Sequence, residues 1–173
     1  MVKFIIHHNV EGTTIYFSQF YQTNIQSRKL EALMEIITAH LKTDQEREGP
    51  SPSDILRFST YTIESQEYSV SSLKPLQEEF EGVQILYCEV GGIVITLGLH
   101  ENDSVFVAQN FVTNWVSALK KLYKTNLLNN IYDKTDELLA YLDKLLPLGN
   151  LLLINQSYIE YLKTEATNLT RAM

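Results

Sequence analysis

The sequence of 173 residues has a single cysteine, Cys88, so no disulfide can form within the chain. This cysteine lies inside the apolar run Val83–Val90, where a lone cysteine is a small buried hydrophobe more often than a nucleophile. No stretch approaches the roughly 18 consecutive apolar residues of a membrane span. The first ten residues, MVKFIIHHNV, contain no apolar stretch long enough for a signal peptide. We therefore expect a cytoplasmic protein.

Basic residues are also few, with 14 Lys and Arg against 21 Asp and Glu, for a net charge of −7. A protein that binds nucleic acid through its phosphates usually has a basic face, which this balance disfavours. It equally disfavours unaided adsorption to anionic lipid. The one basic cluster, Lys120, Lys121 and Lys124, falls at the end of a predicted helix, where cations stabilise the C-terminus.

The motifs of catalysis are missing as well. The sequence has no GxGxxG, phosphate-loop or GxSxG pattern, and Gly91-Gly92 leads into a strand, where a phosphate-binding loop leads into a helix. His7 and His8 are adjacent in a predicted strand, so they face opposite sides and cannot share a metal without a bulge. The chain has four histidines, no HxxxH spacing and no second cysteine. We therefore expect histidines that lie at the surface or in turns with their hydrogen bonds satisfied, and no zinc site. We expect no enzyme, no metal and no cofactor.

Hydrophobic patterning predicts strands in the first part of the chain, with one helix among them. The helix, Ser27–Leu41, places Leu30, Leu33, Met34, Ile37 and Leu41 on one face. Two glycines between β-rich runs are typical of a hairpin turn, which Gly91-Gly92 supplies. The predicted strands are Val2–His8, Thr13–Phe20, Ile55–Ile63, Val83–Val90 and Ile93–Leu99.

The remainder of the chain is predicted to be mainly helical. After the capping residues Asn102-Asp103-Ser104, a helix runs over Val105–Tyr123, and a second runs over Ile131–Leu146 until Pro147 and Gly149 end it. A short extended piece and a last short helix around Tyr158 follow.

Together these elements predict a single α+β domain over residues 1–173, in the order β-β-α-β-β-β-α-α with a short C-terminal helix. We expect a five-stranded antiparallel meander whose first strand is central, because Phe4, Ile5 and Ile6 are too uniformly apolar for an exposed edge. The Ser27–Leu41 helix is expected on one face of the sheet, with the later helices alongside.

The polar segment Glu64–Gly82 is predicted to be an inserted, mobile connection between the third and fourth strands. Its nineteen or so residues exceed an ordinary turn, and connections that long are usually functional or disordered. It carries an apolar pattern at Leu73, Leu76 and Phe80, typical of a short helix docked on the domain or on a partner.

Apolar and aromatic side chains are dense from Phe106 to Leu162, more than one stripe per helix needs. This density predicts an exposed apolar patch of several hundred Å², the size that marks an interaction site. The candidate contact residues are Phe106, Phe111, Trp115, Tyr158 and Leu162. The alternative is that Phe111 and Trp115, at helical spacing, belong to the core.

Several segments resemble the sigma subunits of clathrin-adaptor-type complexes. The opening MVKFIIHHNVEGTTIYFSQFY has an aliphatic, a basic residue and Phe, then Asn9, Gly12 and Tyr21 at the places where those subunits carry Asn, Gly and Tyr. NFVTNWVSALKKLY is similar to their first long C-terminal helix, and YDKTDELLAYLDKLLPLGNLLLINQSYIEYL to their ending. The order of elements matches over nearly the whole chain except Glu64–Gly82.

Within that family, the sequence is most similar to sigma subunits of the fifth adaptor protein complex, through a set of scattered matches. The resemblance implies a longin fold and a heterotetramer with two large subunits and one medium subunit, in which the sigma subunit binds one large-subunit trunk. It also implies association with late endosomes and lysosomes, and partners of the spatacsin and spastizin type. The matching residues are His100-Glu101-Asn102, Leu146-Pro147, Gly149, Leu151-Leu152, Asn155 and Leu162.

Two rival hypotheses remain. One stays within the fold: a sigma-like subunit of the related TSET coat, or a conventional sigma subunit. The other is a longin-domain protein that engages small GTPases or tethering factors. One departure from the conventional pattern already bears on function, because alignment on Asn9 and Gly12 puts Ile15 where those subunits carry an Arg that contacts acidic dileucine signals.

Overall fold

The computed structural model describes residues 1–21, 27–49, 56–63, 80, 82–123, 135–152, 157–158, 160–161 and 164. The chain groups into two compact units, Met1–Val105 and Phe106–Met173. The expectation of a single domain over residues 1–173 stays a prediction. None of the helices in the described ranges is long and apolar enough to cross a membrane.

The first unit contains a five-stranded sheet in which every pairing is antiparallel. One helix, α1 (Ser27–Glu48), is inserted between the second and third strands. The predicted α+β class is therefore confirmed. The strands are β1 (Phe4–Asn9), β2 (Ile15–Phe20), β3 (Phe58–Thr62), β4 (Gln84–Val90) and β5 (Ile93–Leu99), in the sheet order β2-β1-β5-β4-β3.

This order shows that the predicted meander is wrong in one connection. After β2 the chain passes through α1 and enters the sheet again at the opposite edge, as β3. The middle strand is therefore β5, and β1 lies next to it, between β2 and β5. Pairing β1 with β5 gives the two most buried strands interior positions. The argument that β1 is too apolar for an edge is thus confirmed.

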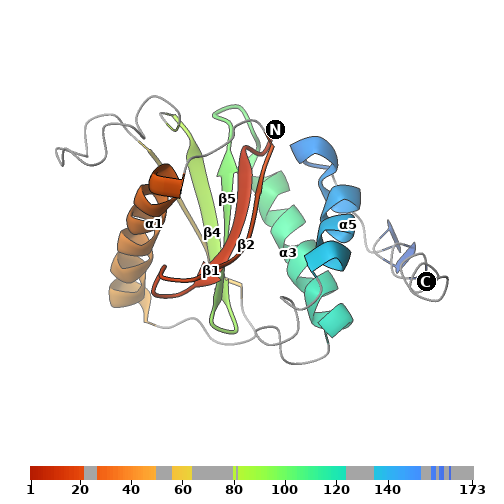
Figure 1. Ribbon diagram of the computed structural model, residues 1–173, viewed down its shortest axis with the longest axis horizontal. Helices are drawn as coiled ribbons and strands as arrows, with labels where there is room; N and C mark the ends of the chain where they lie inside the picture. Colours follow the sequence, from red (N-terminus) through yellow and green to blue (C-terminus); the bar gives the residue numbers. More distant parts are fainter. Residues whose placement is uncertain are drawn as a thin grey trace. The chain divides into compact units, whose positions relative to one another are not determined.

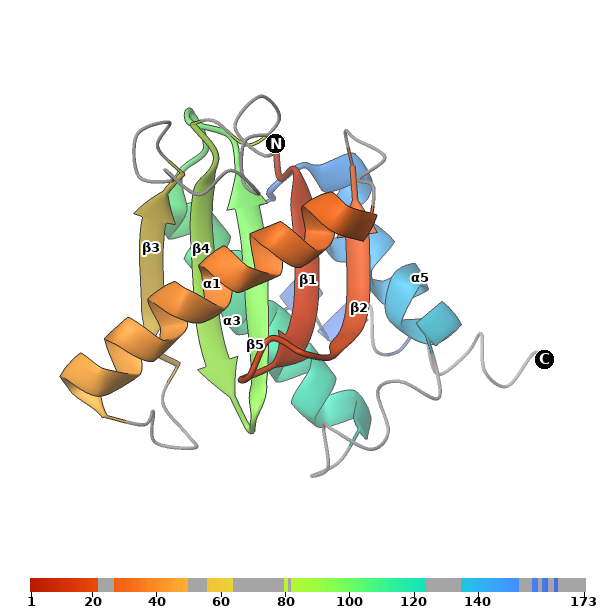
Figure 2. The same ribbon diagram turned by 60° about the vertical axis from the view of Figure 1, so that its left-hand side comes forward.

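The core of this unit lies between the sheet and α1. Figure 2 shows α1 crossing one face of the sheet. Leu33, Ile37 and Leu41 of the helix share a buried cluster with Phe4 and Ile6 of β1, among others. All of β5 is buried, and so are the first five residues of β1. Strands buried along their whole length are covered on both faces, which explains their lack of clean alternation.

The turn between β1 and β2 is organised by the side chain of Asn9. Its Oδ1 accepts a hydrogen bond from the Thr14 amide at 2.9 Å, and its Nδ2 donates to Thr13 Oγ1 at 2.9 Å. Gly12 donates to the Asn9 carbonyl at 3.0 Å with a φ of 71°. A Cβ on Gly12 would lie 1.9 Å from Oγ1 of Thr38 in α1, so this glycine lets the turn approach the helix.

Gly12→Ala is expected to destabilise the fold by more than backbone strain alone. The left-handed conformation costs a non-glycine residue about 1–2 kcal/mol, and the contact with Thr38 forces either the turn or α1 to move. Gly49→Ala is the matched control, because Gly49 has a φ of 72° and nothing within 4 Å of its added Cβ. Urea titration should give a clearly larger loss for Gly12→Ala. Equal losses would contradict the close-approach explanation.

The second unit is helical in its described part, as Figure 1 shows. It contains α3 (Val105–Tyr123), α5 (Thr135–Leu145) and the 3-10 turn η2 (Pro147–Gly149). The limits of α3 agree with the prediction, and α5 lies inside the predicted Ile131–Leu146, whose first four residues are outside the described ranges. Ser157, Tyr158, Glu160, Tyr161 and Thr164 are helical, where a last helix was expected. The placement of these helices beside the sheet stays a prediction.

Candidate interaction surface

Large apolar side chains reach solvent mainly in the second unit. Of the six such residues in the described ranges, only Met1 belongs to the first unit. The second unit therefore contains five of the six exposed large apolar side chains among the described residues. The area of a continuous patch stays a prediction. The other five are Phe106, Leu148, Leu152, Tyr158 and Tyr161.

Helix α3 separates the predicted contact residues into two groups. Phe106, in its first turn, is 71% exposed, whereas Phe111 and Trp115 have no exposed surface. The two buried rings stack with their centroids 6.5 Å apart. A side chain without exposed surface offers no contact to a partner, so Phe111 and Trp115 fit the core alternative and Phe106 alone remains on α3.

The C-terminal segment presents two tyrosines. Tyr158 and Tyr161 stack with a centroid distance of 6.4 Å, and Tyr161 is 60% exposed. The Tyr158 hydroxyl donates a hydrogen bond to the backbone carbonyl of Lys144 at 3.3 Å, which holds the segment at the end of α5. The predicted contact residue Leu162 lies outside the described residues.

The turn η2 holds the most exposed of these side chains, Leu148, at 80%. Its backbone has φ 50° and ψ 32°, and within the described ranges no other non-glycine residue has a positive φ. This left-handed conformation costs an L-residue about 1–2 kcal/mol. The residue pattern does not predict this conformation, because Gly149 in the same turn is the residue that normally adopts a positive φ.

The predicted insertion is closed at its base. The Ile63 amide donates to the Val83 carbonyl at 3.0 Å, and the Gly82 amide donates to the Ile63 carbonyl at 3.1 Å. Phe80 is buried and packs edge-on against Phe4, with ring centroids 5.8 Å apart. Phe80 thus docks on the domain itself, the first of the two predicted possibilities. Leu73 and Leu76 lie outside the described residues.

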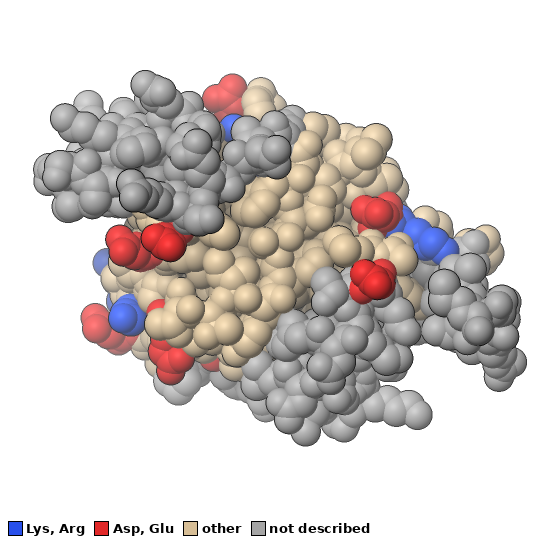
Figure 3. Space-filling view, viewed as in Figure 1, with Lys and Arg blue, Asp and Glu red and all other residues tan. Residues whose placement is uncertain are grey.

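Strand β2 forms one edge of the sheet and carries no charged residue. Ile15, its first residue, is partly buried against the core cluster. Figure 3 shows that the middle of that view, where Figure 1 places β1 and β2, consists of side chains other than Lys, Arg, Asp and Glu. The described Lys and Arg side chains form no continuous basic area on this face.

A small pocket with several polar lining residues lies between the end of α1 and strands β3 and β4. The Tyr87 hydroxyl donates to the Asp44 carboxylate, and Gln45 Nε2 donates to Glu89 Oε2 at 3.0 Å. The sequence could not predict this pocket, because its residues come from three separate segments. Both carboxylates already accept hydrogen bonds from neighbours, and the lining holds no nucleophile paired with a base. Leu41, Gly49, Arg57 and Ser59 complete the lining.

The expectation that the histidines lie at the surface or in turns is wrong for His7 and His8, which have no exposed surface. His8 Nδ1 donates to the Asn9 carbonyl at 2.7 Å, which leaves Nε2 to accept from the Thr96 hydroxyl at 3.1 Å. His7 packs against Phe17 at a centroid distance of 5.2 Å. The reason is that β1 is covered on both faces, so even its polar side chains are buried.

Burial shifts the acid–base properties of these groups. Desolvation lowers the pKa of His7 to about 3, helped by repulsion from His8. Desolvation also lowers the pKa of His8 to about 4, against the hydrogen bond to Asn9. Cys88 is buried, as predicted, and burial raises the pKa of its thiol to about 12, which leaves it unreactive at neutral pH.

The described residues contain no group of three or more His, Cys, Asp or Glu side chains placed to hold a metal ion. The pairing of β1 with β2 does shift register between His7 and His8. Even with this irregularity, the two rings have separate partners, Phe17 for His7 and Thr96 for His8.

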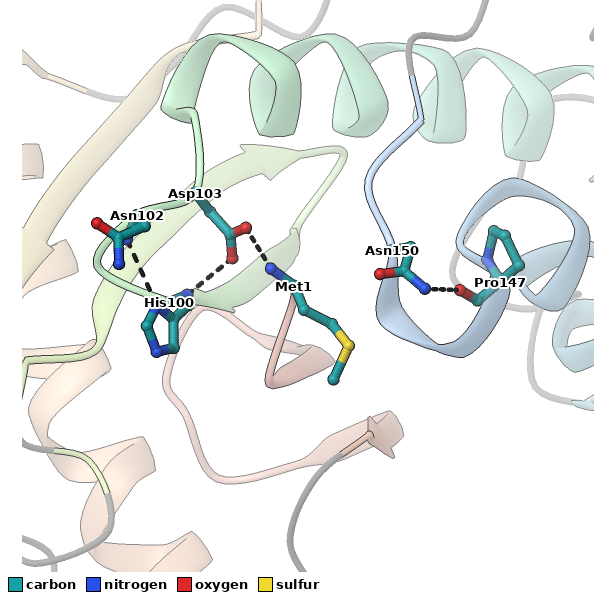
Figure 4. A network of polar contacts seen from close by, with 6 residues as sticks. All are labelled: Met1, His100, Asn102, Asp103, Pro147 and Asn150. Atoms are coloured by element: carbon teal, nitrogen blue, oxygen red, sulfur yellow. Dashed lines mark hydrogen bonds and ion pairs between the residues drawn. The ribbon is translucent and has the colours of Figure 1, made fainter.

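The segment before α3 is fixed by Asp103. Its carboxylate pairs with the terminal ammonium of Met1 and accepts from the His100 amide at 2.9 Å (Figure 4). The Asp103 amide donates back to the His100 carbonyl at 2.9 Å. The side chain of Asp103, expected to cap α3, therefore stabilises the turn that precedes the helix.

Comparison with known proteins was made by sequence and by fold. No family model and no curated protein sequence matches the chain. Its fold matches a chain in the structure described as a homology model of the full-length AP-3 complex in a stretched open conformation. The TM-score is 0.62 at 17% sequence identity, over 99% of this chain and 95% of that chain. The chain therefore has the fold of an adaptor-complex component over essentially its whole length.

Proposed function

We propose that this protein is a non-catalytic small subunit of a heterotetrameric vesicle-coat adaptor complex, acting as a scaffold against a large subunit. The observation that carries the proposal is the fold match to a chain of the AP-3 complex, because it covers nearly the full length of both chains.

Two features of the chain support a binding role. Five of the six exposed large apolar side chains in the described ranges belong to the second unit, with Phe106, Leu148 and Tyr161 the most exposed of them. Exposed apolar side chains of this kind are typical of surfaces that a partner covers. The polar pocket at the end of α1, by contrast, offers two carboxylates that neighbouring side chains already engage.

Within this role, we propose the sigma subunit of the fifth adaptor complex, on late endosomes and lysosomes. The support is the sequence resemblance, including His100-Glu101-Asn102 and the Leu146-Pro147 ending. The chain would bind large and medium adaptor subunits and proteins of the spatacsin and spastizin type. It would reach the cytoplasmic face of the membrane only through the complex.

Affinity purification from native cytosol, followed by mass spectrometry of the bound proteins, tests the proposal. Recovery of adaptor large and medium subunits is the expected result, and the identity of the large subunit separates the fifth complex from a TSET coat or a conventional adaptor. A stable dimer of longin domains, or a bound small GTPase without adaptor subunits, would favour the rival longin function.

The subunit is further expected not to recognise acidic dileucine signals. Conventional sigma subunits, which the sequence resembles, use an Arg in the second strand where this chain has Ile15. An aliphatic side chain cannot replace charge-assisted hydrogen bonds to a carboxylate, which contribute about 1.5–3 kcal/mol each. Strand β2 supplies no other cation, and the net charge of −7 repels an acidic peptide. The side chain of Lys29, a possible substitute, lies outside the described part.

Titration of an acidic dileucine peptide into the subunit bound to its large-subunit trunk measures this directly. We expect a dissociation constant at least about tenfold above the low-micromolar range, because the loss of one charge-assisted contact is enough to raise it by that factor. A second peptide with its acidic residue neutralised is the control and should bind equally weakly. Low-micromolar affinity that falls when the acid is neutralised would show that another cation serves the site.

A further inference from the structure

The turn between α5 and the C-terminal segment contains an apolar side chain that the fold does not use. Leu148 adopts a left-handed backbone conformation, with φ 50° and ψ 32°, that glycine and asparagine accept more readily than leucine. Its side chain is 80% exposed, whereas Gly149 directly after it and Leu146 two residues before it are buried. Because Gly or Asn would form the same turn with less strain, the stability of the turn does not explain a leucine here.

The turn holds Leu148 in one position. The Leu146 amide continues the hydrogen bonding of α5 by donating to the Leu142 carbonyl at 2.7 Å. The Pro147 carbonyl accepts from the Asn150 amide at 2.9 Å and from Asn150 Nδ2 at 3.2 Å, as Figure 4 shows for the side chain. With the φ of Pro147 also fixed by its ring, the chain is ordered on both sides of Leu148. A backbone held in this way needs no further ordering when a partner binds.

The surroundings of Leu148 have the composition of an interface centre. No charged residue occurs from Leu145 to Leu152, although charged residues make up 20% of the chain. Leu152 is a second exposed leucine in the same stretch, at 41%. Centres of protein interfaces are depleted in charge, and a few well-placed apolar residues there carry most of the affinity.

We propose that Leu148 is an anchor residue for the large adaptor subunit and inserts into an apolar pocket on that partner. This inference rests on the proposed function, since it assigns a contact to the partner named there. The partner pocket must be uncharged and concave, because the turn presents a single protruding leucine with uncharged neighbours. In this explanation the strain at Leu148 is retained because binding needs the side chain.

The test uses three variants of the full chain: Leu148→Gly, Leu148→Asn and, as the matched control, Leu148→Met. The affinity of each is measured by biolayer interferometry for the large subunit that co-purifies with the wild-type protein, together with the melting temperature. Leu148→Gly and Leu148→Asn should melt at or above the wild-type temperature and bind at least tenfold more weakly. Leu148→Met keeps an apolar side chain and should bind within about threefold of wild type.

The outcomes separate this inference from the proposed function. If the wild-type chain binds no adaptor large subunit, the proposed function fails and the inference fails with it. If wild type binds and the Gly and Asn variants bind equally well, only the inference is overturned. It is also overturned if both variants melt well below wild type as they lose affinity, because Leu148 would then be supporting the fold.

Discussion

Lowering the pH from 7 to 5 is expected to reduce the free energy of unfolding by about 4 kcal/mol, through His7 and His8. Their pKa values are lowered by burial to about 3 and about 4, whereas an imidazole in the unfolded chain titrates near 6.5. At pH 5 the imidazoles are protonated in the unfolded chain and neutral in the folded one. This difference lowers the free energy of unfolding by about 2 kcal/mol per histidine. Small domains have only about 5–15 kcal/mol of stability, so the loss is large.

The direction of the effect follows from which state binds more protons. Since both folded pKa values are depressed, the unfolded state takes up protons first as the pH falls. The histidine contribution is therefore fully present above about pH 6.5 and decreases as the pH falls toward 4 and 3. Ordinary exposed histidines give no such dependence.

Urea titrations at pH 7 and pH 5 measure the effect, with one variant to assign it and one as control. His8→Asn retains a donor for the Asn9 carbonyl without a titratable ring, and should remove close to half of the pH dependence. His100→Asn, the same substitution at an exposed histidine, is the matched control. Equal stability of the wild-type protein at the two pH values would contradict the burial of the histidine pair.

Phe80→Ala is expected to destabilise the protein by about 3–5 kcal/mol, the usual cost of removing a buried phenylalanine ring. Phe80 is 2% exposed and belongs to the cluster between the sheet and α1. Its ring centroid lies 5.8 Å from that of Phe4. Phe106→Ala is the matched control: the same substitution at a ring that is 71% exposed should change stability by about 0.5 kcal/mol or less. Guanidinium unfolding of the two variants decides the matter, and similar losses would contradict the placement of Phe80.

The burial of Phe80 changes the expected effect of a loop deletion on stability. A purely mobile insertion over Glu64–Gly82 would be dispensable for stability as a whole, but Phe80 belongs to the core. Replacing residues 65–78 with a short Gly-Ser linker while keeping Phe80 is expected to alter stability by only about 1 kcal/mol, because loop closure depends weakly on length. The backbone pairing of Ile63 with Val83 holds the two ends together already. A loss as large as that of Phe80→Ala would place further core side chains in the segment.

Local signals gave the elements with errors in some limits, since α1 runs to Glu48 and not to the predicted Leu41. Nonlocal contacts explain the errors in how the strands are arranged. Strand β5 and helix α3 have the predicted limits, because a two-glycine turn and a clear helical period mark them. The sheet order was not predictable from local pattern, because it depends on β1 pairing with β5, about ninety residues along the chain.

The candidate surface was only partly predictable for the same reason. A helical spacing of aromatic residues does not tell core from surface, and the structure buries Phe111 and Trp115 while exposing Phe106. The burial of His8 depends on a hydroxyl at Thr96, 88 positions away. The strain at Leu148 is a property of backbone geometry that residue type alone does not reveal.

Native mass spectrometry of the complex purified through this chain tests the central claim most directly. The adaptor proposal predicts one predominant assembly of four different subunits, with a single copy of this chain beside two large subunits and one medium subunit. Detection of the chain alone, or of a complex containing two copies of it and no large adaptor subunit, would contradict the proposal.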